Sequence, residues 1–287
     1  MTWRCARVSL RLLSPMHIGW RTFGNLKVTR PYLPGRALWG GLTARLARDF
    51  PALGGYESVG REVHDSLAFS YFFGSLSDQT VTDWPFDEKW WEFSSRFLGS
   101  YASTALADGH SKEDGSLHET EYLCPIVEGA RQVFLVGYVF ERDGCRLPWR
   151  EALDQIQFGG ERGYGWGRVV GCKPFEDSGK IFERPLDLNG ERPAVRWKAA
   201  CPALAHVRAA AGWRIEGAIE PLVGRMTNPH RGVPGVEHSA ADVTWIPGSV
   251  LREDNEVACQ IQENGIWVLP ASRPVTAGAA EGEAPGT

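Results

Sequence analysis

The chain has 287 residues, of which 43% are hydrophobic and 23% charged, and its formal net charge is −4. No run approaches the roughly 18 apolar residues of a membrane-spanning helix, and the opening MTWRCARVSL lacks the apolar core of a secretion signal. Its six cysteines stand singly, without a CxxC pair, which argues against a zinc site and against a disulfide framework. We therefore expect a cytoplasmic protein with no membrane partner, no metal and no cofactor.

Basic residues concentrate at the start of the chain. Residues 1–50 contain nine lysines and arginines but one acid, Asp49, whereas acids outnumber bases over the rest. Such asymmetry indicates a local site for a polyanion. The alternative is a solvated basic face that acidic neighbours balance.

The first predicted element is a strand. Residues 5–13, CARVSLRLL, alternate apolar and polar, which predicts a half-buried strand with every second residue from Ala6 to Leu12 on its apolar face. Pro15 and Gly19 then break the pattern and begin a loop.

A helix is predicted to begin near Arg36, because leucines recur four residues apart from Leu38 to Leu46. Its entry, Pro34-Gly35-Arg36, would leave backbone N–H groups free at the start of the helix. Those groups and the helix dipole form a natural seat for a phosphate.

The middle of the chain mixes helices and strands. In order we predict a second helix over 58–75, an irregular segment over 76–95, an exposed excursion over 100–118, strands from 118 and over 132–140, a short helix over 147–157 and a strand over 168–172. This order predicts an α+β fold with helices on one side of a sheet.

The stretch FGGERGYGWGR, residues 158–168, is rich in glycine, arginine and aromatic residues. It lacks the third glycine of a GxGxxG motif and the Lys-Ser/Thr of a Walker A loop. Two interpretations are left: a loop that binds phosphates and stacked bases, or tight β-structure with inward aromatics. We expect Gly163 and Gly165 to occupy positions where a Cβ would be costly.

The last third of the chain, from about Pro174, is predicted to be rich in β-strands. Strand-like pieces cover 195–217, and 256–269 predicts a hairpin that turns at Asn264-Gly265. Residues 271–287 are small and aperiodic and are expected to be disordered. The expected units are therefore 1–172, 173–270 and a tail over 271–287.

Four segments together resemble the RAMP (repeat-associated mysterious protein) superfamily of CRISPR-associated proteins, over roughly residues 4–172. They are LLSPMHIGW, YLPGRALWGGLTARL, GSLHETEYL and GGERGYGWGRV, and their order matters more than any one of them. A later WIPGS, residues 245–249, also resembles a segment of this superfamily.

The resemblance implies a ferredoxin-like (RRM-type) βαββαβ core with insertions, followed by a degenerate second part that is α+β or β-rich. It also implies binding of CRISPR RNA beside other RAMP subunits, with target RNA or DNA reached through guide pairing. Chain length and a single motif set are most similar to the subunit that caps the 5′ tag of the guide in type III or type III-derived effectors. The alternatives are a repeat-cleaving endoribonuclease that processes CRISPR RNA and a repeating backbone subunit.

The RNA-binding residues that the motifs and the resemblance imply lie in three groups. They are Ser14, His17, Gly19, Arg21 and Lys27 after the first strand; Arg36 and Arg45 on the helix; and Gly160, Arg162, Gly163, Tyr164, Gly165, Trp166 and Arg168 in the glycine-rich stretch. Of Tyr164 and Trp166, one is expected to stack on a base and the other to pack inward, while Arg48 is expected to be a plain surface charge.

A catalytic role is not expected. A metal-independent ribonuclease needs an acid and a base near one phosphate, and His17 is the one histidine in the strand-loop, helix-entry and glycine-rich motifs. His17 would be the catalytic residue only if the chain were a nuclease. The excursion over 100–118 is either a finger that inserts between guide nucleotides or a solvated loop.

Overall fold

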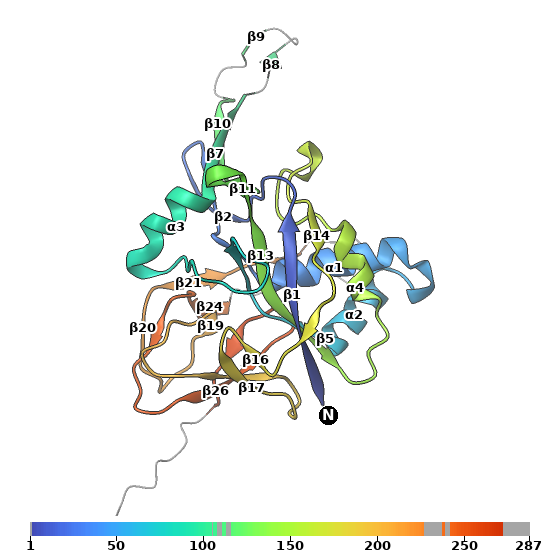
Figure 1. Cartoon of the computed structure of the whole chain (residues 1–287), viewed down its shortest axis with the longest axis vertical. Coiled ribbons are helices and arrows are strands. Elements are labelled where there is room, and N and C mark those ends of the chain that lie inside the picture. The colour runs from blue at the N-terminus through green and yellow to red at the C-terminus, as the bar shows by residue number, and fades with distance from the viewer. Residues whose placement is uncertain are drawn as a thin grey trace, which may run out of the picture.

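An antiparallel sheet forms the centre of the fold. The structure, a computed structural model, describes residues 2–104, 106–107, 111–112, 116–226, 237–238 and 242–271. In this sheet the strand order is β14-β1-β13-β6-β4, with β5 beside β13 and β15 beside β1 (Figure 1). The bounds are β1 Trp3–Leu12, β4 Tyr32–Leu33, β5 Leu67–Phe69, β6 Phe72–Ser75, β13 Phe134–Arg142, β14 Val169–Gly171 and β15 Glu176–Asp177.

The connections of this sheet are those of a ferredoxin-like core. Between β1 and the β5–β6 segment lie α1 (Gly35–Asp49) and α2 (Tyr56–Ser66), and between β13 and β14 lies the short α4 (Trp149–Ala152). The four core strands thus follow the chain as β1, β5–β6, β13 and β14, with β1 and β13 paired at the centre of the sheet. This βαββαβ order confirms the predicted α+β, ferredoxin-like core.

Helices α1, α2 and α4 cover one face of the sheet. The leucine stripe of α1 is fully buried at Leu38, Leu42 and Leu46, where it packs against residues of β1 such as Val8 and Leu10. Apolar residues four apart lie on one side of a helix, so the predicted stripe and the observed contact agree.

The opposite face of the sheet is also buried. An eight-stranded sheet from the second part of the chain packs on it, and Trp3, Phe73 and Phe140 share one apolar core with Trp197 and Trp267. The second face of β1 is therefore covered at Trp3, Cys5 and Ser9, whereas Arg11 is exposed, so the expectation of a half-buried strand is wrong for the first part of β1 and correct at its end. The polar residues between its apolar positions could not reveal this second cover.

The second part is built from short strands. Its large sheet has the order β16-β17-β18-β26-β27-β19-β24-β21, and β20–β25 and β22–β23 form separate pairs. The bounds are β16 Lys180–Ile181, β17 Arg184–Asp187, β18 Ala194–Trp197, β19 Val207–Arg208, β20 Ile215–Glu216, β21 Ile219–Leu222, β22 Arg225–Met226, β23 Glu237–His238, β24 Asp242–Trp245, β25 Val250–Leu251, β26 Val257–Ile261 and β27 Trp267–Val268. The predicted hairpin over 256–269 is confirmed by the β26–β27 pair, and the expected disorder over 271–287 lies outside the described residues except for residue 271.

Two expectations in the middle of the chain are wrong. The helix predicted over 58–75 ends at Ser66, and the aromatic run that follows forms β5 and β6, because its residues are buried on both sides of the sheet. The segment 76–95, expected to be irregular, contains a 3-10 turn (Asp87–Lys89) and begins α3 (Trp90–Phe97). Helix α3 forms because Phe93 and Phe97 pack together and are both buried.

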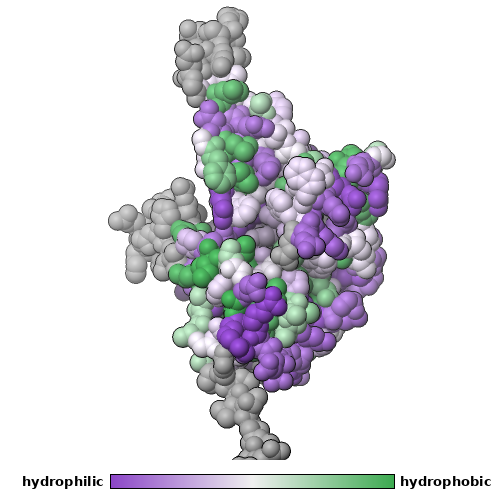
Figure 2. Space-filling view, turned by 90° about the vertical axis from the view of Figure 1, so that its left-hand side faces the viewer, coloured by the Kyte–Doolittle hydropathy of each residue, from purple (hydrophilic) through white to green (hydrophobic). Residues whose placement is uncertain are grey.

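A second sheet, β2-β3-β10-β7, carries a hairpin that projects from the body of the molecule in both views (Figures 1 and 2). Its bounds are β2 Gly19–Phe23, β3 Leu26–Thr29, β7 Leu98–Ser103 and β10 His118–Leu123. Short pairs β8 Leu106–Ala107 with β9 Ser111–Lys112 and β11 Ile126–Val127 with β12 Arg131–Gln132 lie beyond and below it. The described residues of the predicted excursion over 100–118 thus belong to this hairpin, while residues 105, 108–110 and 113–115 lie outside the described part of the chain.

None of the helices that the structure describes is both long and apolar enough to cross a membrane.

Candidate nucleic-acid interface

The glycine-rich stretch closes onto the loop that follows β1. The backbone N–H of Gly160 donates to the carbonyl of His17 at 2.9 Å, and that of Gly167 donates to Pro15 at 2.7 Å. The N–H of Arg168 donates to Oγ of Ser14 at 2.9 Å. Two segments that the sequence singled out separately are therefore one structural unit.

Close backbone approach explains two of the glycines. A Cβ on Gly159 (φ 81°) would lie 2.1 Å from the carbonyl oxygen of His17, and one on Gly167 (φ 75°) would lie 1.9 Å from a backbone oxygen of the same stretch. At Gly163 a Cβ would meet open space and φ is not positive, so the fold itself does not require glycine there. Gly165 also faces open space, but its φ of 82° still favours glycine.

His17 fastens this unit to the projecting sheet. Its side chain is 7% exposed, and Nδ1 lies 2.7 Å from the carbonyl oxygen of Glu121 on β10. Nε2 lies 3.7 Å from where a Cβ on Gly19 would stand. The imidazole therefore holds the loop against β10, while Gly19 itself is exposed.

A groove of about 390 Å³ runs between α1 and the glycine-rich stretch. We call it the arginine groove; its lining residues are Gly41, Ala44, Arg45, Arg48, Gln155, Ile156, Gln157, Arg162 and Gly163. Arg45 is bound in place by Asp49 and by the carbonyl of Gln155, 3.3 Å away. Arg48 and Arg162 are exposed and form no ion pair with the described residues.

The arginine groove is suited to phosphate. Two guanidinium groups without a carboxylate partner carry net positive charge to its surface, and guanidinium binds phosphate through paired N–H donors. The small residues Gly41 and Ala44 line the groove on the α1 side and leave space for a ligand there. Arg48, expected to be a plain surface charge, belongs to this groove; its spacing of three residues from Arg45 was the signal that could have placed it there.

On its other side the glycine-rich stretch borders a pocket of about 440 Å³ beneath the projecting hairpin. We call it the aromatic pocket; its lining residues are Pro15, Tyr101, Ser103, Thr104, Thr120, Tyr122, Glu161, Tyr164 and Trp166. Trp166 makes edge contacts with Tyr122 (5.1 Å between ring centroids) and Tyr101 (6.3 Å). Tyr164 is 84% exposed. The indole is therefore half-buried against the tyrosines of the hairpin, whereas the phenol is free to stack on a ligand.

The remaining predicted residues lie apart from these two recesses or at their margin. Lys27 binds Glu161 at 3.1 Å, at the wall of the aromatic pocket. The Arg21 guanidinium lies over the ring of Trp20, 4.5 Å from its centroid, and lines neither recess. Arg168, the last residue of the glycine-rich stretch, is exposed and lines neither recess.

The start of α1 is not an open phosphate seat. A Cβ on Gly35 would lie 2.8 Å from the backbone of Asn264, and one on Gly224 would lie 1.9 Å from the Arg36 guanidinium. The second part of the chain therefore covers this helix end, and burial lowers the pKa of Arg36. The expectation of a phosphate seat here is wrong, because the covering hairpin lies over 220 residues away in sequence.

Several of the early basic residues are balanced within the protein. Arg7 pairs with Glu176 at 2.7 Å, and Arg30 pairs with Glu220 at 2.7 Å. The surplus of positive charge in residues 1–50 is thus partly internal, and the polyanion hypothesis narrows to the arginine groove and its surroundings.

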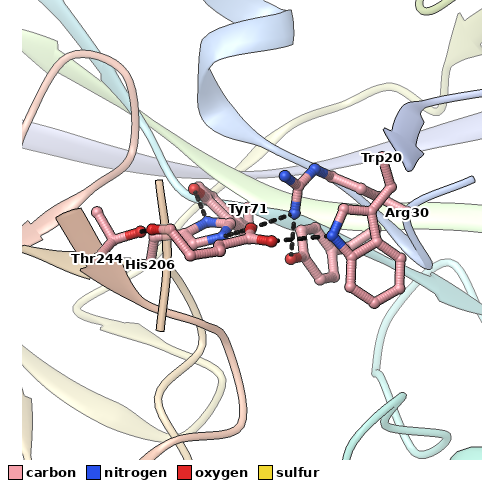
Figure 3. A network of polar contacts seen from close by, with 7 residues as sticks. Trp20, Arg30, Tyr71, His206 and Thr244 are labelled. Carbon is pink, nitrogen blue, oxygen red and sulfur yellow. Dashed lines mark hydrogen bonds and ion pairs between the residues drawn. The ribbon is translucent and has the colours of Figure 1, made fainter. Parts of the chain in front are cut away.

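Arg30 belongs to a buried polar network between the two parts of the molecule (Figure 3). The Glu220 carboxylate accepts hydrogen bonds from Trp20 Nε1 (2.9 Å) and Arg30 Nη1 (2.7 Å), and it lies 2.5 Å from His206 Nε2. On its other side His206 Nδ1 lies 2.6 Å from the Tyr71 hydroxyl. No sequence motif marks these residues.

The contacts within this network determine the protonation states of Glu220 and His206. Burial opposes ionisation of Glu220, but the His206 hydrogen bond and the Arg30 charge outweigh it and lower the pKa of Glu220 to about 2. Burial lowers the pKa of His206, so its imidazole is neutral at pH 7. A neutral imidazole that accepts from Tyr71 and donates to Glu220 satisfies both ring nitrogens.

Comparisons with known proteins give structural neighbours and no sequence relatives. No family model and no curated protein matches the chain. A chain of a cryo-EM structure of the type III-B Cmr-beta complex with cognate target RNA and AMPPnP has 11% identity and a TM-score of 0.49 over 85% of each chain. A chain of the same complex bound to cognate target RNA has 10% identity and a TM-score of 0.42, over 58% of this chain and 96% of its own. Similarity at this level assigns no function.

Proposed function

We propose that this protein binds the guide RNA of a CRISPR effector complex and caps its 5′ tag, without cutting RNA. The observation that carries the proposal is the pairing of the arginine groove with the aromatic pocket on the two sides of one glycine-rich stretch. A single strand needs both kinds of site, because its phosphates bind guanidinium groups and its unpaired bases stack on aromatic rings.

The arrangement of the core supports binding at this end of the molecule. In an RRM, RNA lies on the open face of the sheet and stacks on its aromatic residues. Here the corresponding face, with Phe73 and Phe140, is buried under the second part. The glycine-rich stretch and the hairpin beside it are exposed, so we place the RNA there.

The non-catalytic part of the proposal rests on His17. Its ring is buried and engaged with the backbone of β10, which suits a structural fastening better than proton transfer to a substrate. We expect purified protein to leave labelled repeat RNA intact with or without divalent metal. Specific cleavage that His17→Ala abolishes would instead support the repeat-cleaving endoribonuclease.

The decisive experiment is to purify the protein from its host and sequence the RNA that copurifies. We expect discrete guides that share one repeat-derived 5′ tag, and their recovery should fall in the Tyr164→Ala/Arg162→Ala double variant. The matched control is Arg61→Ala, which removes an exposed arginine of α2 that pairs with Glu57 and lines neither recess. Guides bound without a common tag would favour a repeating backbone subunit, and no enriched RNA would reject the proposal.

A further inference from the structure

Glu161 lines the aromatic pocket and forms an ion pair with Lys27, which lies next to the lining residues without being one of them. Their Nζ and Oε1 atoms are 3.1 Å apart, and the Glu161 side chain is 23% exposed. Lys27 of β3 is the register partner of Thr120 of β10, and Thr120 lines the pocket. The pair therefore lies at the β3–β10 wall, beside the aromatic residues of the glycine-rich stretch.

The backbone at Glu161 is held in an unusual conformation. Its φ and ψ are 55° and 23°, in the left-handed region that residues other than glycine rarely adopt. Two glycines precede it, yet the left-handed position itself is occupied by a glutamate. Backbone strain of this kind concentrates at binding sites, where the surrounding structure holds a residue in an unfavourable conformation that orients its side chain.

The chemistry of the pair selects among bases. An ionised carboxylate only accepts hydrogen bonds, through two oxygens side by side. Guanine alone among the four RNA bases offers two neighbouring N–H donors, at N1 and N2, and next to them an O6 acceptor. A carboxylate with an ammonium group at its side matches that edge, whereas adenine, cytosine and uracil each place an acceptor opposite one of the oxygens.

We propose that the aromatic pocket is a guanine site. Glu161 accepts from N1–H and N2–H of the base, Lys27 donates to O6, and Tyr164 stacks on the ring. This inference rests on the proposed RNA-binding function and adds a base preference to it. Glu161 is then the residue that determines specificity, and Tyr164 supplies affinity for any base.

The test uses labelled six-nucleotide oligouridines that carry one central guanosine, inosine, adenosine or no replacement, with binding followed by fluorescence anisotropy. Guanosine should bind about tenfold more tightly than adenosine or uridine, since one charge-assisted hydrogen bond more or less changes affinity by that order. Inosine lacks the N2 amino group, so its affinity should fall between the two.

Three variants separate the possible roles. Glu161→Gln should abolish the preference, because an amide presents one acceptor and one donor. Glu119→Gln is the matched control: Glu119 is exposed on β10 one residue from Thr120 and does not line the pocket. Tyr164→Ala should weaken all four oligonucleotides together.

The outcomes distinguish this inference from the proposed function. If Tyr164→Ala weakens binding but the four oligonucleotides bind equally well to the unmodified protein, the guanine site is wrong and RNA binding stands. If Glu161→Gln weakens all four by one factor, Glu161 only ties the glycine-rich stretch to β3, and the inference is again wrong. If none of the four binds, the proposed function itself is rejected.

Discussion

Two of the polar clusters that bring together distant parts of the chain differ in how their side chains are satisfied. Around Glu220 every charged group has a partner within the protein, and the carboxylate is 8% exposed. In the arginine groove and the aromatic pocket, Arg48, Arg162 and Tyr164 are exposed, and the two arginines pair with no described carboxylate. Partnered polar groups in an interior hold parts together, whereas unpartnered ones beside a recess are available to a ligand.

The largest effect is expected when the cluster around Glu220 is disrupted. Glu220→Ala would leave the Arg30 guanidinium, 11% exposed, as a buried charge without its carboxylate, which costs about 3–5 kcal/mol of unfolding free energy. The measurement is denaturant unfolding. Glu216→Ala, which removes an exposed carboxylate of the same part paired with Arg252, should change stability by at most about 0.5 kcal/mol. Equal losses in both variants would contradict the comparison.

The same cluster should make stability depend on acid. Folding lowers the pKa of Glu220 from 4.5 to about 2. Between these two pH values the unfolded chain therefore binds more protons than the folded protein does. The contribution is complete above about pH 4.5 and is lost as the pH falls towards 2, about 3 kcal/mol in all. His206, whose pKa is also lowered, adds a loss below its ordinary 6.5. Thermal unfolding of Glu220→Gln against pH should show a flatter acid limb; an unchanged limb would exclude Glu220 as its source.

A smaller effect is expected to distinguish Tyr164 from Trp166 in the aromatic pocket. Tyr164→Ala should reduce RNA affinity by about 1–3 kcal/mol with little change in melting temperature, because its ring contacts solvent. Trp166→Ala should lower the melting temperature instead, because its ring packs on Tyr101 and Tyr122. Both quantities are measured on both variants, and early melting of both with normal RNA binding would make this stretch a piece of the core.

The smallest effect concerns single phosphates. Arg48→Ala and Arg162→Ala should each reduce the slope of log affinity against log salt by about 0.7, the value for one phosphate of a single strand. Arg36→Ala should leave the slope unchanged, because its guanidinium packs against Gly224. A reduced slope for Arg36→Ala with none for the other two would move the RNA path to the covered end of α1.

The ferredoxin-like elements could be predicted from the sequence because each carries its own periodicity. The leucine spacing in α1 and the alternation in β1 each predict one buried face, and neither prediction requires knowing which element packs on that face. The aromatic run after Ser66 misled the prediction, since a strand buried on both faces has no alternation to distinguish it from a helix.

Contacts across long sequence distances could not be predicted in the same way. Trp20 and Glu220 are 200 residues apart, and no local pattern relates them. The candidate site was predicted in its residue types, but its division into a groove and a pocket depends on how the glycine-rich stretch folds back on His17. That fold depends on Gly159 and Gly167 rather than on Gly163, which the sequence favoured.

The aromatic core between the two sheets also governs how the protein is made. Its members extend from Trp3 to Leu269, so the core cannot close until Leu269 has left the ribosome. At ordinary rates of translation, Phe73 and Phe140 would wait on the order of ten seconds on an apolar surface before their partners arrive. The nascent chain is therefore expected to depend on chaperones that shield such surfaces, and a fragment that stops at Cys172 would need them permanently.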